Sequence, residues 1–307
     1  MTDLAAAIVS GDARAISRGI SLVENGGDEG PALVGALYAR SGRAFLVGIT
    51  GAPGAGKSTL VDGLVSRWRK VGKSVGVIAV DPTSPFSGGA LLGDRVRMQT
   101  HAEDEGVFIR SMATRGHLGG LTRATSDAAL VLDASGKDFV AIETVGVGQD
   151  EVEIAGAADV SVVVLVPGMG DDVQALKAGV MEIADIFVVN KADRDGADRV
   201  VADVESVLGL HPYEDHEWRP PIIRTQAATG DGLEDLVEAI DKFRGQTARV
   251  EARRRSRAMT QLQSIIADHL KKQVESRITG EEIERLVDRI AAREVDPYTA
   301  ASLVLAR

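Results

Sequence analysis

Gly51-Ala52-Pro53-Gly54-Ala55-Gly56-Lys57-Ser58-Thr59 is the stretch that decides the fold of this chain. An apolar run, Phe45 to Ile49, precedes it, and a helical pattern begins at Thr59. A strand, a glycine-rich turn and the start of a helix, in that order, are typical of a phosphate-binding P-loop. The backbone N–H groups of such a loop can surround a phosphate, and the helix adds its positive end. The stretch therefore predicts that the chain binds a nucleoside triphosphate.

The last residues of this stretch carry its chemistry. Lys57 would reach the β- and γ-phosphates, and the Ser58 hydroxyl would ligate Mg²⁺. A glycine turn with no ligand is the alternative reading. The Lys-Ser pair and the strand before it favour the P-loop strongly.

The composition is that of an ordinary globular protein. The chain has 307 residues, of which 44% are hydrophobic and 26% are charged, and a formal net charge of −10. This charge argues against a nucleic-acid partner. Without cysteine the chain has neither disulfides nor thiolate metal sites. The start lacks a basic leader, and no apolar stretch approaches a membrane span of about 20 residues, so we expect a cytoplasmic protein.

Strand and helix patterns alternate around the P-loop. We expect strands at 44–49, 75–80, 106–110, 138–143, 160–166, 185–190 and 221–224, and helices near 57–70, 91–102, 120–133, 150–157, 172–183, 197–208 and 233–244. Strands that are apolar throughout are typical of a sheet buried on both faces. The pattern predicts an α/β fold with a doubly wound, mostly parallel sheet, whose ligands bind at the carboxyl ends of the strands.

Helical patterns without strands lie at both ends. We expect an N-terminal helical extension at 1–42, the P-loop domain at 43–246 and a C-terminal helical arm at 247–307, with helices at 247–275, 279–292 and 297–305. Five arginines at 249–257 read as a solvated helix face, with a docking surface as the alternative. Leu262, Ile266 and Leu270 recur at helical spacing, so that helix needs a partner.

A second motif identifies the base. The apolar run Ile186 to Val189 leads into Asn190-Lys191-Ala192-Asp193. The Asp193 carboxylate can accept the N1–H and the exocyclic amino group of guanine together, which adenine does not offer. An unpaired carboxylate facing adenine would be penalised by ~1–3 kcal/mol or more. Lys191 would lie along the base, and Asn190 would tie the strand end to the P-loop. The nucleotide is therefore expected to be GTP.

A loop follows the last strand, where GTPases usually contact the guanine oxygen through backbone N–H groups. Gln226, Ala227 and Ala228 occupy it here. Ser is commoner than Gln at the first position, but a backbone contact tolerates that change.

Carboxylates at other strand ends are candidates for Mg²⁺. Glu143 begins Glu-Thr-Val-Gly146, where Glu143 would hold the metal and the Gly146 N–H would meet the γ-phosphate. Asp81 ends the second strand, and Asp94 follows a glycine-rich loop; both suit a metal or water-positioning role. Arg95 or Arg97 could neutralise transition-state charge, with surface ion pairing as an equal alternative.

Two further loops bear on regulation. Many GTPases place Gln directly after the glycine that meets the γ-phosphate, but Val147 stands there, so we expect slow intrinsic hydrolysis. The segment from Pro167 to Lys177 follows a strand and is charged, and it reads as a switch or partner loop.

Several blocks together resemble one family, the methylmalonyl-CoA mutase-associated GTPases (MeaB/ArgK-like). The blocks are the P-loop, Val80–Ala90, Gly93–Met98, Arg115–Gly120 and Glu143–Gln149. The resemblance extends over nearly the whole chain and implies P-loop contacts from 51 to 59, with Lys57 central. It implies active-site carboxylates at Asp81, Asp94 and Glu143, and guanine recognition by Asn190, Lys191 and Asp193.

The same resemblance implies partners. Asp171, Gln174 and Lys177 would match an additional switch that communicates with the mutase. Family members are homodimers joined through C-terminal helices, and they use GTP to gate delivery of adenosylcobalamin to the mutase and to protect it. The expected cofactors are GTP or GDP with Mg²⁺, and the candidate catalytic residues are Lys57, Asp81, Asp94, Arg97 and Glu143.

Two other functions stay open. A nickel-insertion GTPase shares this fold class, but such proteins hold metal with Cys or His clusters, whereas this chain has no Cys and five separated His. A kinase acting on a protein or small molecule is an older assignment for ArgK-like proteins. Guanine specificity and paired switch loops are more typical of a regulatory GTPase than of a kinase that donates phosphate to an acceptor.

Overall fold

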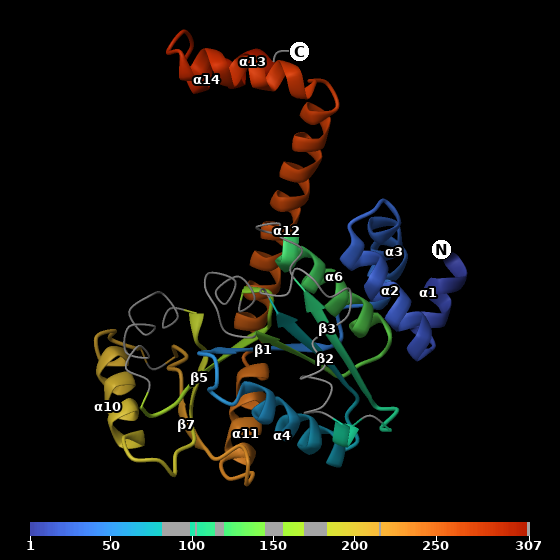
Figure 1. Cartoon of the computed structure of the whole chain (residues 1–307). Coiled ribbons are helices and arrows are strands. Elements are labelled where there is room, and N and C mark those ends of the chain that lie inside the picture. The colour runs from blue at the N-terminus through green and yellow to red at the C-terminus, as the bar shows by residue number, and fades with distance from the viewer. Residues whose placement is uncertain are drawn as a thin grey trace. The chain divides into compact units, whose positions relative to one another are not determined.

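The computed structural model describes residues 1–81, 99–101, 103–113, 120–144, 156–168, 183–214 and 216–305 (Figure 1). Within these ranges only the backbone is described for residues 81, 99, 113, 120–122 and 275. The chain divides into two compact units, Met1–Arg254 and Arg255–Arg307. The predicted domain divisions after residues 42 and 246 stay predictions.

Seven strands of the first unit form one sheet in which every pairing is parallel. The strand order is β3-β2-β4-β1-β5-β6-β7. The strands are β1 (Phe45–Gly51), β2 (Val75–Asp81), β3 (Val107–Ala113), β4 (Phe139–Thr144), β5 (Val160–Leu165), β6 (Ile186–Asn190) and β7 (Ile222–Thr225). All seven predicted strands are confirmed. The four strands β4, β1, β5 and β6 are buried along their whole length, because their side chains are covered on both faces.

Helices cover the two faces of the sheet (Figure 1). On one face lie α4 (Lys57–Lys70) and α11 (Leu233–Arg244), whose buried Leu60, Leu64 and Phe243 meet the sheet. On the other face lie α6 (Gly120–Ala134) and α10 (Ala197–Leu208). The N-terminal helices α1 (Thr2–Val9), α2 (Ala13–Asn25) and α3 (Glu29–Leu37) pack against α6 and share its apolar core. The expected doubly wound α/β fold is therefore confirmed.

Four of the helices predicted around the sheet are confirmed. Those expected at 57–70, 120–133, 197–208 and 233–244 correspond to α4, α6, α10 and α11. Of the helix expected near 91–102, only the 3₁₀ turn Gln99–His101 is described. Most of the helix expected near 150–157, and most of the one near 172–183, lie outside the described residues.

Three helices form the C-terminal part of the chain: α12 (Thr247–Glu275), α13 (Gly280–Ala291) and α14 (Pro297–Leu305). The first eight residues of α12 belong to the first unit and the rest to the second. A capping box between Thr279 and Glu282 begins α13. Leu262, Ile266 and Leu270 on α12 are about half exposed. An apolar row of this kind is typical of a helix that packs against another chain.

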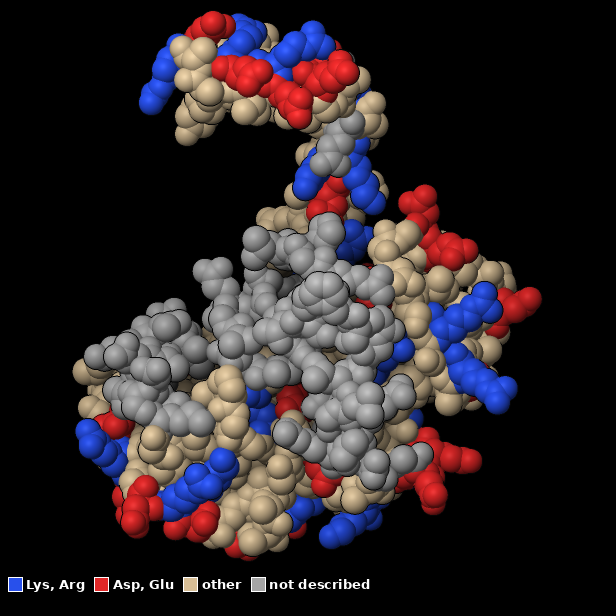
Figure 2. All heavy atoms as spheres, in the orientation of Figure 1, with Lys and Arg blue, Asp and Glu red and all other residues tan. Residues whose placement is uncertain are grey.

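Surface charge is mixed. On the face drawn in Figure 2, outside its grey area, acidic and basic side chains are intermingled over the N-terminal and C-terminal helices. The full sequence has a formal net charge of −10, and the absence of a nucleic-acid partner stays a prediction. In the ranges that the structure covers, no helix has the length and apolar character that a membrane crossing requires.

Candidate functional site

The loop between β1 and α4 needs glycine at two of its positions. Gly51 has φ +141°, and a Cβ there would lie 2.2 Å from the Val164 carbonyl oxygen on β5. Gly56 has φ +89°, and a Cβ there would lie 2.5 Å from the Asn190 side-chain nitrogen. Both conformations are strained for other residues, and both neighbours are too close for a side chain. The glycines of the motif therefore let the loop press against β5 and β6.

Lys57 is held inside this loop. Its side chain is buried, and its Nζ donates to the Gly51 carbonyl at 2.5 Å and to the Ala52 carbonyl at 3.0 Å. These bonds curl the loop around the ammonium group at the start of α4. The positive end of that helix and the Lys57 charge meet at the place where an anion would bind.

Ser58 and Glu143, the two residues predicted to hold Mg²⁺, lie in contact beside the loop. The Ser58 hydroxyl donates to the Glu143 carboxylate at 2.5 Å, and the Glu143 residue is 5% exposed. Glu143 reaches this position because it is the next-to-last residue of β4, which pairs with β1 in a register that sets Glu143 against Ile49. A hydroxyl and a carboxylate fit Mg²⁺, which takes few protein ligands and completes its shell with water and phosphate oxygens.

The other predicted metal ligand with a described backbone is Asp81. It ends β2, the strand next to β4, so it lies at the same edge of the sheet as Glu143. Asp94, Arg97 and Gly146 lie outside the described residues. Within those residues, no group of three or more His, Cys, Asp or Glu side chains is placed to hold a metal ion.

Asn190 connects the end of β6 with two loops. Its side-chain nitrogen donates to the Ala55 carbonyl of the P-loop at 2.8 Å. Its side-chain oxygen accepts from the Thr225 hydroxyl and from the Ala227 backbone N–H, each at 3.0 Å. Asn190 is 2% exposed; its bonds with Ala55 and Thr225 are buried, and the bond with Ala227 is partly buried. The phosphate loop and the loop after β7 are thereby fixed to one side chain.

Lys191 and Asp193 follow on the open side of the site. Lys191 has φ +55°, unusual for a residue with a Cβ, and its Nζ donates to the Gly54 carbonyl at 2.7 Å. The Lys191 stem therefore crosses the P-loop, where it can form one wall for a base. Asp193 is exposed, as a carboxylate that meets a ligand must be.

The loop after β7 closes on itself. The Gln226 backbone N–H donates to the Asp231 carbonyl at 3.0 Å, and the Gly230 N–H donates to the Gln226 carbonyl at 2.9 Å. Ala227 and Ala228 lie in the turn. The structure thus brings the P-loop, the Asn190–Asp193 segment and residues 226–228 to one edge of the sheet. Their binding roles stay predictions, and Asp171, Gln174 and Lys177 lie outside the described residues.

Sequence reasoning missed one arginine near this site. Arg67 on α4 donates from Nη2 to the Gly230 carbonyl at 2.9 Å, across 163 positions of sequence. No pattern in the sequence marks it, because it reads as one of several charged residues at the end of an amphipathic helix.

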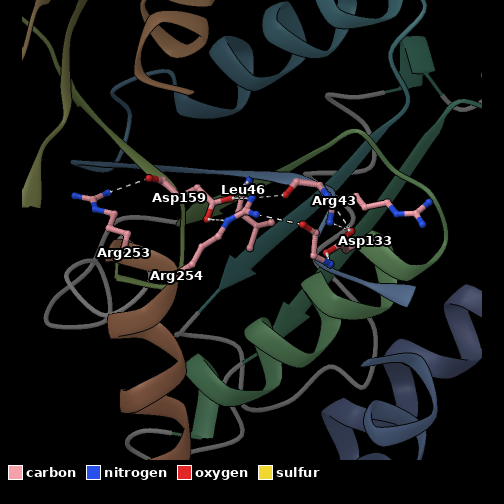
Figure 3. Close-up of polar contacts among 8 residues, drawn as sticks. Arg43, Leu46, Asp133, Asp159, Arg253 and Arg254 are labelled. Carbon is pink, nitrogen blue, oxygen red and sulfur yellow. Dashed lines mark hydrogen bonds and ion pairs between the residues drawn. The ribbon is translucent and has the colours of Figure 1, made fainter. Parts of the chain in front are cut away.

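At the amino ends of the strands, Arg253 and Arg254 depart from the predicted solvated face (Figure 3). Arg249 and Arg255 are exposed, as that prediction requires. Arg254 makes a bidentate pair with the fully buried Asp159, at 2.9 and 3.0 Å. Arg253 makes another with Asp185 through Nη1 and Nη2, at 2.5 and 2.9 Å. The two carboxylates also accept the backbone N–H groups of Leu46 and Ser161.

These pairs change the acid–base properties of their members. The hydrogen bonds to Asp159 raise the pKa of Arg254 above its ordinary value. Burial raises the pKa of Asp185, and the Arg253 charge opposes that rise. The first two turns of α12 are therefore fixed to the amino ends of β1, β5 and β6, away from the P-loop.

Comparisons with known proteins match the chain to one family. The sequence matches the family described as methylmalonyl Co-A mutase-associated GTPase MeaB over residues 16–279. A Pyrococcus horikoshii protein named as a candidate GTPase is 52% identical over 300 residues, covering 96% of this chain and 94% of its own. The Escherichia coli GTPase ArgK is 38% identical over 249 residues, covering 80% and 74%.

A mammalian relative and a solved structure extend the comparison. The mouse methylmalonic aciduria type A homolog, a mitochondrial protein, is 35% identical over 268 residues, covering 85% of this chain and 65% of its own. The crystal structure of a LAO/AO transport system kinase superposes with a TM-score of 0.73 at 25% identity, covering 99% and 96% of the two chains.

Proposed function

Because the chain belongs to the family of methylmalonyl-CoA mutase-associated GTPases, we propose that it gates adenosylcobalamin loading of a cobalamin-dependent acyl-CoA mutase and protects that enzyme. Methylmalonyl-CoA mutase is the first candidate partner. The family match over residues 16–279 is the observation that carries the proposal. The name of the mouse relative, which refers to methylmalonic aciduria, supports the same partner.

The family description and the name of the Escherichia coli relative both contain the word GTPase, which supports GTP binding and hydrolysis by this chain. In the proposed complex Lys57 binds the β- and γ-phosphates, and Asp193 accepts the two donors of guanine. Ser58 and Glu143 would hold Mg²⁺, with Asp81 and Asp94 as further ligands. The metal, when bound, would neutralise charge on the transferred phosphoryl group. Arg97 and the Gly146 N–H would add to that neutralisation.

Regulation would come from the partner. We place the mutase-responsive switch at Asp171, Gln174 and Lys177, and we expect slow hydrolysis until the mutase binds. The half-exposed row of Leu262, Ile266 and Leu270 supports a homodimer formed through the C-terminal helices. A cytoplasmic location stays a prediction.

A second candidate is a kinase, because the solved relative with a TM-score of 0.73 is titled a transport system kinase. A kinase would leave its γ-phosphate on an acceptor, whereas a GTPase releases it as inorganic phosphate. Nickel insertion finds less support, since the chain has no cysteine.

The deciding experiment measures release of inorganic phosphate by the purified protein, alone and with methylmalonyl-CoA mutase, from GTP and from ATP. We expect slow turnover of GTP, stimulation by the mutase, and no turnover of ATP. Radiolabel that appears on an acceptor rather than as free phosphate would favour the kinase. Absence of both stimulation and a complex would contradict the mutase role and leave the GTPase assignment standing.

Asp193→Asn provides a matched test of the base assignment. An amide in place of the carboxylate can donate to the 2-oxo group of xanthine but loses one acceptor for guanine. We expect GTP affinity to fall by roughly tenfold or more and XTP affinity to rise. A variant that still prefers GTP would show that Asp193 does not contact the base.

A further inference from the structure

The loop from Gln226 to Asp231 is held at both of its ends. Near the first end, the Ala227 N–H donates to the Asn190 side chain at 3.0 Å. Near the last end, the Gly230 carbonyl accepts from Arg67 at 2.9 Å. Asn190 belongs to the guanine motif, but Arg67 belongs to none of the predicted motifs. It lies on α4, the helix that begins at Lys57.

Arg67 makes hydrogen bonds through Nη1 and Nη2 and an ion-pair contact through Nε. Besides Gly230, its Nη2 donates to the Glu234 carboxylate at 3.1 Å, and its Nη1 donates to the Gly63 carbonyl at 3.2 Å. Its Nε lies 3.0 Å from the other Glu234 oxygen, an ion-pair contact. The Arg67 side chain is only 18% exposed. Lysine, a point charge on a flexible stem, could not make these contacts together.

The surrounding packing leaves Arg67 and the loop little freedom. Gly230 has φ +92°, and a Cβ there would lie 2.9 Å from Arg67 Nη2. One turn earlier on α4, a Cβ on Gly63 would lie 2.4 Å from the buried Leu233 side chain of α11. Thus α4 and α11 approach closely directly beside the Arg67–Gly230 bond. The loop rests on α4, and α4 carries the P-loop lysine at its other end.

We propose that Arg67 is a positioning residue for base recognition. By holding the Gly230 carbonyl, it keeps the turn after β7 where the Ala228 backbone N–H meets the O6 atom of guanine, because the N–H groups of Gln226 and Ala227 donate to Asp231 and Asn190. Its effect is transmitted through the loop, because Arg67 itself does not touch the base. The inference rests on the proposed GTP-binding function and adds a specificity determinant to it.

The test uses nucleotides that separate the two halves of base recognition. In 6-thio-GDP, sulfur replaces O6. The sulfur is a weaker acceptor for the loop, whereas the N1–H and the exocyclic amino group, which Asp193 would accept, are kept. IDP keeps O6 and lacks the exocyclic amino group. Affinities of the full-length protein for GDP, 6-thio-GDP, IDP and ADP are measured by titration calorimetry.

Arg67→Gln should lower GDP affinity by roughly 3- to 10-fold, which corresponds to the net contribution of one typical hydrogen bond. The preference for GDP over 6-thio-GDP should fall by the same factor, while the preference for GDP over IDP stays within about twofold. Arg67→Lys should restore part of the lost preference. These ratios separate positioning of the loop from a general loss of stability, which would weaken all nucleotides equally.

Arg69→Gln is the matched control. Arg69 lies two residues further along α4 and forms a bidentate pair with Asp104, both bonds at 2.8 Å, away from the loop. This control should leave every nucleotide ratio unchanged. If Arg67→Gln does not fold, Glu234→Gln, which loosens the same guanidinium, should shift the ratios in the same direction by a smaller factor.

Two outcomes would overturn the inference in distinguishable ways. If the wild-type protein binds ADP as tightly as GDP, the proposed function is wrong and the role of Arg67 is lost with it. If the wild-type protein prefers GDP, and Arg67→Gln and Glu234→Gln keep the same ratio of GDP to 6-thio-GDP, the role of Arg67 alone is wrong.

Discussion

Asn190→Ala tests the central link of the site. The substitution removes three hydrogen bonds and leaves the Ala55 carbonyl, the Thr225 hydroxyl and the Ala227 N–H without that partner. Each bond contributes a net ~1 kcal/mol, so the three together contribute about 3 kcal/mol to the free energy of unfolding. For a unit of this size, that corresponds to a fall in Tm of about 6–12 °C. Nucleotide affinity should also fall, because the P-loop and the loop after β7 lose their common fixed point.

The assay is thermal and urea unfolding without nucleotide, together with the rise in Tm that saturating GDP produces. Thr225→Val is the control, because it removes only one of the three bonds at a site that is 1% exposed. We expect a loss of about 1 kcal/mol for this variant. If Asn190→Ala loses no more than Thr225→Val, or if GDP raises the Tm of both as much as that of the wild type, the reasoning is wrong.

Three further predictions concern single residues. Gly51→Ala should weaken GDP binding by at least about tenfold in calorimetry, because the new Cβ would lie 2.2 Å from the Val164 oxygen. Lys57→Met should lower GTP affinity by about 2 kcal/mol or more while the nucleotide-free Tm, followed by scanning fluorimetry, holds or rises, because a buried charge is removed. Arg253→Gln should lower the free energy of unfolding by about 3 kcal/mol at pH 7, measured by urea unfolding across pH. That loss should shrink toward pH 4. Burial already raises the pKa of Asp185, and removal of Arg253 raises this pKa further. Asp185 is therefore protonated as the pH falls, and a protonated carboxyl group needs no counter-charge. A loss independent of pH would contradict the last argument.

The sequence predicts the sheet well because its signals are local. The run from Val160 to Leu165 is apolar except for Ser161, and a near-continuous apolar run of this length is typical of a strand covered on both faces. The P-loop and the Asn190–Asp193 segment are also local, so their positions at strand ends could be predicted residue by residue. Their convergence follows from the parallel sheet, whose carboxyl ends share one edge.

The contacts that sequence reasoning missed connect residues far apart in the chain. Arg67 meets Gly230 across 163 positions, and Arg254 meets Asp159 across 95. In both cases the arginine lies on a helix whose charged composition is typical of an exposed surface. The partner of Arg67 is a loop carbonyl, and the partner of Arg254 is a carboxylate just before a strand. Helical periodicity predicts the face of the helix on which a residue lies, but it does not predict which residue from elsewhere in the chain contacts that face.

The arginine pairs at the base of α12 also bear on how this protein can vary among relatives. Residues 247–254 continue smoothly into the C-terminal helices, yet they contribute the guanidinium groups for two buried carboxylates of the sheet. A chimera that exchanged the arm after residue 246 would have to inherit arginines at the same two positions, whereas an exchange after residue 254 would leave the sheet intact. We therefore expect the C-terminal helices to be exchangeable between relatives only from residue 255 onward.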